Sequence, residues 1–197
     1  SNTEHQEVKL SGEVHRLRIA QRLPPNDIPW QCEHALAGGG SVVLSGVHGF
    51  DVLRWLVGRT PDAIQCRCER IAPHPYESLF DARFSFDGRL LLASWEVAKF
   101  CASRSALLEL VGTDGQLWAD YQQGRVLRLA GRALKTLAEP GDPPTLPRAL
   151  EAFCRWQHGE IPCPVPLAEG IEGLRMADAC YRSDATGLMV RIAPAAE

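Results

Sequence analysis

His48 is the residue with the clearest capacity for acid–base chemistry. His48, Asp51 and Trp55 fall along one side of a predicted helix, apart from the apolar stripe that includes Phe50. An acidic side chain three residues after a histidine can orient the imidazole, as a general acid or base requires. A packed histidine with a single hydrogen bond is the simpler alternative, and residue chemistry alone favours it.

The glycine triplet at residues 38–40 could suggest a phosphate-binding loop, but its surroundings do not fit one. A dinucleotide fingerprint that starts at Gly38 would need glycine at position 43, where Val43 stands. No Gly-Lys pair precedes a serine or threonine as a Walker loop requires. The triplet instead predicts a tight turn into a helix, which glycine allows because it lacks a Cβ. We therefore expect no cofactor site in this chain.

The other reactive side chains follow no catalytic or metal-binding pattern. The six histidines are not spaced for ligation and no His-Glu-x-x-His occurs, so we expect no metal site. No Gly-x-Ser-x-Gly sequence, the mark of a nucleophilic serine, occurs either. Glu96 and Lys99, near a strand end, are expected to form a solvated pair. The seven cysteines include no Cys-x-x-Cys, which favours reduced thiols in a cytoplasmic protein.

Charge and length limit the classes of partner. A net charge of −3, with scattered arginines, favours neither nucleic acid nor an anionic membrane surface. No apolar run reaches the length of roughly 18 residues that a membrane helix needs. No signal peptide precedes the first strand. We expect residues 1–10 to be a tag remnant and leader, and residues 11–197 to form a single domain.

The elements that must position these residues are strands and a few helices. A strand over 13–21 precedes a helix that follows the glycine triplet and ends before Gly58, where a positive φ is easily adopted. Six strands are then predicted, at residues 63–71, 79–86, 90–97, 105–111, 116–119 and 126–129. Short turns such as Asp87-Gly88 make successive strands antiparallel neighbours.

Two helices and a short strand complete the predicted order. Leu150 and Phe153 belong to the apolar stripe of the first helix, and Ile171 and Leu174 to that of the second. Residues 188–192 are the last predicted strand. The fold class is therefore α+β: an open, mostly antiparallel sheet with helices on one face. Because three helices leave one face of the sheet uncovered, we expect a homo-oligomer that forms through this face.

Three motifs, in order, resemble the Gfo/Idh/MocA family of oxidoreductases (glucose-fructose oxidoreductase, inositol dehydrogenase and rhizopine catabolism). Residues 38–58 resemble its signature helix: a glycine triplet, two apolar residues, Asp, Gly, His, Asp, then Leu-x-Trp-x-x-Gly. Residues 108–117 are similar to its strand-turn-strand with a Gly-Thr-x-Gly turn. Residues 169–187 are similar to its final helix, Ala-x-Tyr-x-Ser-x-x-x-Gly. The likeness spans residues 11–192.

The resemblance implies the second domain of a two-domain enzyme. In the family an N-terminal Rossmann domain binds NAD or NADP and carries a catalytic lysine, and that domain has no counterpart in this sequence. The C-terminal domain, of a fold like that of dihydrodipicolinate reductase and glyceraldehyde-phosphate dehydrogenase, contacts a small-molecule substrate such as a sugar or cyclitol. On this basis His48 is the candidate catalytic residue, and Trp30, His48 and Asp51 are candidate substrate contacts.

One departure from the family pattern affects the chemistry. The position of the family's first aspartate is Leu44, one helical turn before His48. Leucine supplies no carboxylate to orient or charge the imidazole. Three hypotheses follow: the substrate-binding and oligomerisation domain of an NAD(P)-dependent oxidoreductase, inactive as a fragment; a degenerate, non-catalytic binding and dimerisation module of the same fold; or an unrelated α+β scaffold.

Overall fold

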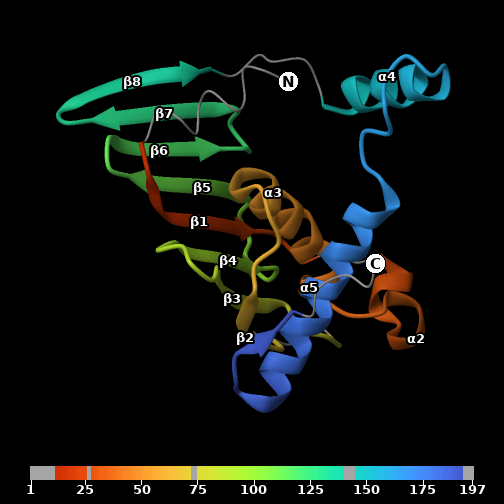
Figure 1. The fold of residues 1–197 in the computed structure, drawn as a ribbon. Coiled ribbons are helices and arrows are strands. Elements are labelled where there is room, and N and C mark those ends of the chain that lie inside the picture. Colours follow the sequence, from red (N-terminus) through yellow and green to blue (C-terminus); the bar gives the residue numbers. More distant parts are fainter. Residues whose placement is uncertain (1–11, 26–27, 72–74, 140–144, 193–197) are drawn as a thin grey trace.

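A computed structural model describes residues 12–25, 28–71, 75–139 and 145–192, so that residues 1–10, the expected tag remnant and leader, lie outside it. The chain forms a nine-stranded sheet with the helices α3 and α5 packed on one face (Figure 1). The elements in order are β1 (Val14–Arg22), η1 (Pro29–Cys32), α2 (His34–Ala37), η2 (Val42–Gly46), α3 (Val47–Val57), β2 (Ala63–Glu69), β3 (Leu79–Ser85), β4 (Leu92–Ala98), β5 (Ser105–Gly112), β6 (Gly115–Asp120), β7 (Arg125–Ala130), β8 (Ala133–Ala138), α4 (Thr145–Gln157), α5 (Leu167–Thr186) and β9 (Val190–Arg191).

The predicted fold class is confirmed: the sheet is open and mostly antiparallel, in the order β8-β7-β6-β5-β1-β4-β3-β2-β9. The expectation that successive strands are neighbours fails at one place. β1 lies between β4 and β5, parallel to β4 and antiparallel to β5. A pairing between residues some 75 positions apart leaves no local signal in a sequence, because turn chemistry reports only on adjacent strands.

Strand β8 is the element that the sequence pattern missed. Four of its six residues are exposed, so no alternation of apolar and polar side chains marks it. The strands of the middle of the sheet do alternate, and their inward side chains form the core. That core also includes Phe50 and Leu53 of α3 and Met176 and Cys180 of α5.

The buried face of α5 matches the predicted apolar stripe only in part. Ala177 is buried and Tyr181 packs against the core, but Ile171 and Leu174 are exposed, and Gly173, Met176 and Cys180 face the sheet instead. Small and sulfur-containing side chains let this helix approach strand β2 closely, with which it makes more contacts than with any other element. The apolar stripe of α4 is present but is also exposed, and this helix stands apart from the sheet in Figure 1.

Candidate functional site

The signature helix starts with a π-helical turn. Val42–Gly46 has π-helical hydrogen bonding and continues directly into α3. Such turns occur often at functional sites, since the extra residue changes the direction of the side chains around it. Here the turn buries Val42 and Ser45 and leaves Leu44 half-buried. The strict helical spacing expected between Leu44 and His48 is therefore interrupted.

His48 and Asp51 both lie on the solvent side of α3, as the sequence predicts, and both are exposed. Within the described residues no hydrogen bond or ion pair joins the two side chains. Asp51 therefore does not orient the imidazole in this structure. Trp30, the third candidate, lies in η1 and exposes 47% of its surface.

The glycine triplet is held by the carboxylate of Glu77. The backbone N–H groups of Gly40 and Val42 donate to Glu77 Oε1 at 2.9 and 3.1 Å, and the N–H of Ser41 donates to the Glu77 carbonyl at 2.9 Å. A Cβ on Gly40 would clash with the backbone carbonyl oxygen of Glu77, which requires glycine there. A negative charge at the start of a helix is stabilising because the free N–H groups carry partial positive charge.

The same geometry shows that these amides cannot cradle a dinucleotide. A pyrophosphate would have to displace the Glu77 carboxylate from the N–H groups and would be repelled by it. The residues present therefore do not fit a dinucleotide at the glycine triplet.

Tyr181 of α5 donates its hydroxyl to Glu77 Oε1 at 2.8 Å. Burial raises the pKa of Tyr181, and the negative charge of Glu77 raises it further, so the phenol remains a donor at neutral pH. Two residues later, Ser183 accepts the backbone N–H of Cys66 at 2.9 Å, and Asp184 accepts that of Cys68 at 2.9 Å. The motif of the final helix thus positions the signature helix and satisfies an otherwise unpaired edge of β2.

Trp95 of β4 sets the packing of α3. Its indole N–H donates to the carbonyl of Gly46 at 3.1 Å, and its ring fills the space where Gly49 has no side chain. Trp95 is 3% exposed. Gly49 therefore has a steric function, and Gly46 supplies the acceptor that fixes the indole.

A small cavity lies where the signature helix begins. Its volume is about 30 Å³, and it is lined by Gln31, Cys32, Gly40, Ser41, Leu44, Pro75, Tyr76, Glu77, Ser78 and Lys99. Burial lowers the pKa of Lys99, whose Nζ lies 3.4 Å from Oε1 of Gln31. Leu44 lines this cavity, whereas Trp30, His48 and Asp51 do not. Sequence reasoning singled out neither Lys99 nor Ser41 as lining residues of this cavity.

The expected pair of Glu96 and Lys99 is not formed. Glu96 of β4 lies on the face of the sheet without helices, whereas Lys99, just after the end of β4, lines the cavity at the start of the signature helix. Glu96 forms ion pairs with Arg18 and with Arg22, the latter at 2.7 Å. Burial by itself would raise the pKa of Glu96, but the hydrogen bonds and charges of Arg22 and Arg18 outweigh it and lower the pKa.

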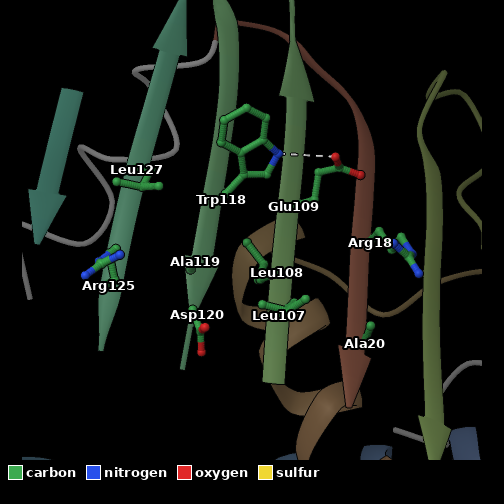
Figure 2. Close-up of a pocket in the computed structure, with 10 residues that line it drawn as sticks. All are labelled: Arg18, Ala20, Leu107, Leu108, Glu109, Trp118, Ala119, Asp120, Arg125 and Leu127. Carbon is green, nitrogen blue, oxygen red and sulfur yellow. Dashed lines mark hydrogen bonds between the residues drawn. The ribbon is translucent and has the colours of Figure 1, made fainter. Parts of the chain in front are cut away.

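This open face contains an apolar hollow among β1, β5, β6 and β7. Figure 2 shows Leu107, Trp118 and Leu127 with the charged residues around them, and the indole N–H of Trp118 donates to Glu109 at 3.3 Å. The hollow has a volume of about 400 Å³. Leu107 of β5 is 46% exposed, and Leu92 of β4 and Leu134 of β8 are more exposed still. These side chains leave apolar surface uncovered on this face.

The cysteines form no disulfide among the described residues. The Sγ atoms of Cys66 and Cys68 lie 3.8 Å apart. A hydrogen bond to Cys180 and burial raise the pKa of Cys66, so this thiol is a poor nucleophile. In the described part of the chain, no group of three or more ligand side chains is arranged to hold a metal ion. Nor is any helix found there with the length and apolar character to cross a bilayer.

Comparison with known proteins gives one family and many structures of the same fold. The model described as the GFO/IDH/MocA C-terminal domain matches residues 9–118, more than half of the chain. No curated protein matches. A levoglucosan dehydrogenase in complex with NADH and levoglucosan superposes with a TM-score of 0.82 at 16% identity, over 98% of this chain and 62% of that one.

Two further structures agree with this result. An NAD binding oxidoreductase from Klebsiella pneumoniae has a TM-score of 0.82 at 17% identity, over 98% of this chain and 62% of that one. GenD2 from gentamicin A biosynthesis, in complex with NAD, has a TM-score of 0.79 at 21% identity, over 96% and 59%. The chain thus spans less than two thirds of the length of these structures, and at this identity the likeness concerns the fold.

Proposed function

The chain belongs to the Gfo/Idh/MocA family as a C-terminal domain, and we propose that it is the substrate-binding and oligomerisation domain of an NAD(P)-dependent oxidoreductase. The substrate is a sugar or a cyclitol-like polyol. The NAD or NADP is held by an N-terminal Rossmann domain outside this chain. The observation that carries the proposal is the signature helix, which presents His48 and Asp51 to solvent directly after a π-helical turn.

In this function the helix acts as a platform for the substrate ring. Phe50 and Leu53 on its opposite side are fully buried, so the platform is rigid. His48 offers a ring nitrogen to a substrate hydroxyl and can accept or donate a proton there. Trp30 supplies an exposed aromatic face, and aromatic faces commonly pack on sugar rings through their apolar C–H groups.

Oligomerisation is assigned to the face of the sheet opposite α3 and α5. The exposed Leu92, Leu107 and Leu134 lie on this face, and two sheets pack stably when such faces meet. The charged part of the same face, with Arg18 and Glu96, can pair with its own copy across a two-fold axis because it carries both signs.

The second candidate function is a binding and dimerisation module without catalysis. It is favoured by Leu44, because no carboxylate adjoins His48 from that side. Under this alternative the platform still binds a polyol, but no Rossmann domain is required.

An NMR titration of the chain with ¹³C-labelled histidine tests the substrate site. D-glucose, D-glucuronate and myo-inositol are added in turn, and at least one is expected to shift the His48 signal saturably. The variant His48→Gln identifies the signal, and His158→Gln, just after the end of α4, is the matched control. If all three probes leave His48 unchanged at high millimolar concentration, the substrate-binding role is wrong.

A further inference from the structure

The cavity beside Leu44 contains donors of hydrogen bonds that lack a suitable acceptor. The side chain of Ser41 is 1% exposed, and its Oγ has no partner among the described residues. Buried hydroxyl groups are nearly always hydrogen-bonded, so an unpaired one marks a place where another group belongs. Ser41 lines the cavity, whose volume of about 30 Å³ exceeds the roughly 10–15 Å³ that one water molecule needs.

Lys99 brings a positive charge to the same cavity. Its neighbour is the neutral amide of Gln31, with Nζ and Oε1 3.4 Å apart. No carboxylate of the described residues forms an ion pair with Lys99. Glu77 also lines the cavity, but its Oε1 already accepts two backbone N–H groups and the hydroxyl of Tyr181. These three donors offset part of the negative charge of Glu77, whereas the positive charge of Lys99 faces only a neutral amide.

Leu44 forms an apolar part of the cavity wall. An aspartate at this position would face Lys99 across the cavity, neutralise its charge and repel a second carboxylate. Leucine does neither, and it excludes water from one wall, which strengthens the attraction between Lys99 and an anion.

We propose that this cavity holds a carboxylate of the substrate, with Lys99 as charged donor and Ser41 as second donor, so that the substrate is a sugar acid. The inference rests on the proposed function, because only the carboxylate lies in the cavity beside Leu44. The sugar ring that carries it extends along the signature helix toward His48. The carboxylate of the sugar acid lies opposite Leu44. In a neutral sugar the corresponding group is a hydroxymethyl, which could occupy the same position but would leave the charge of Lys99 unpaired.

The test uses the same chain with ¹³Cε-labelled lysine, which gives few signals because the sequence has only Lys9, Lys99 and Lys135. D-glucuronate should shift the Lys99 signal saturably, and about ten-fold or more weaker binding is expected for D-glucose, which lacks the charged acceptor. Lys135 in β8 should not respond. Acetate at equal ionic strength should produce a much smaller shift, because it has no ring to contact the helix.

Variants separate this inference from the proposed function, with His48 as an independent reporter. Lys99→Met should weaken glucuronate binding about ten-fold or more, and Ser41→Ala several-fold. Lys135→Met should have no effect. Leu44→Asp should abolish the preference for the acid. If sugars shift His48 but glucuronate shows no preference over glucose, or Lys99→Met binds it equally well, the carboxylate site is wrong and the substrate site stands. If His48 never responds, the proposed function itself fails.

Discussion

Replacement of Gly49 by alanine should loosen the signature helix from the sheet. A Cβ at this position would lie 2.5 Å from Nε1 and 2.7 Å from Cδ2 of Trp95. Carbon atoms in ordinary contact are about 3.5–4.0 Å apart, so the helix or the indole must move by about 1 Å. Neither is free to move, since Trp95 is buried and its N–H donates to Gly46 at 3.1 Å.

The expected cost combines three effects. Overpacking of a filled core costs about 1–3 kcal/mol, and loss of the buried hydrogen bond to Gly46 adds about 1 kcal/mol. Alanine recovers about 1 kcal/mol, because it favours helix over glycine. The free energy of unfolding should therefore fall by about 2 kcal/mol, which for a chain of this length lowers the Tm by roughly 4–8 °C.

Urea unfolding followed by circular dichroism measures this change, with Gly170→Ala as the matched control. Gly170 also lies in a helix, but a Cβ there meets nothing within 4 Å. That substitution should raise the free energy of unfolding by about 0.4–1 kcal/mol. In the double variant with Trp95→Phe, the smaller ring should remove much of the cost of alanine at position 49. A Gly49→Ala chain as stable as the parent would refute the steric reasoning.

Four further outcomes follow from the contacts described above. Glu77→Gln should lower the free energy of unfolding by about 1–2 kcal/mol, because the helix start and Tyr181 lose a charged acceptor; an unchanged urea midpoint would contradict this. Since the folded-state pKa of Glu96 lies below its ordinary value of about 4.3, its ion pairs stabilise the fold above that pH and are lost as the pH falls through the folded value. The urea midpoint of Glu96→Gln should thus lie below that of the parent at pH 7 and converge with it in acid, and a constant difference would argue against the ion pairs. Light scattering at high micromolar concentration should give a dimer or larger, which Leu107→Lys should weaken; a monomeric parent chain would exclude oligomerisation through the sheet. Calorimetric titration with NADH or NADPH should detect no binding to this chain alone, and micromolar binding would overturn the assignment of the cofactor to a separate domain.

Prediction from the sequence was best where side chains alternate between the core and solvent. Strands β3 to β5 follow this rule, and so the α+β class and the open sheet could be inferred. It was poorest where neighbours come from distant parts of the chain. Lys99 was assigned to a solvated pair with Glu96, yet Glu96 lies on the face of the sheet without helices and Lys99 lines the cavity at the start of the signature helix.

The sequence by itself determined the kinds of element, the family and the identity of the residues on the signature helix, because these depend on local periodicity, on turn-forming glycines and on motif order. Only the tertiary structure decided what those residues do for one another. It inserted β1 between β4 and β5, joined Tyr181 to the glycine triplet through Glu77, and brought Lys99 to Leu44. The physical reason is that long-range contacts arise from chain packing, in which hydrogen bonds and van der Waals contacts form between residues whose separation in sequence carries no signal.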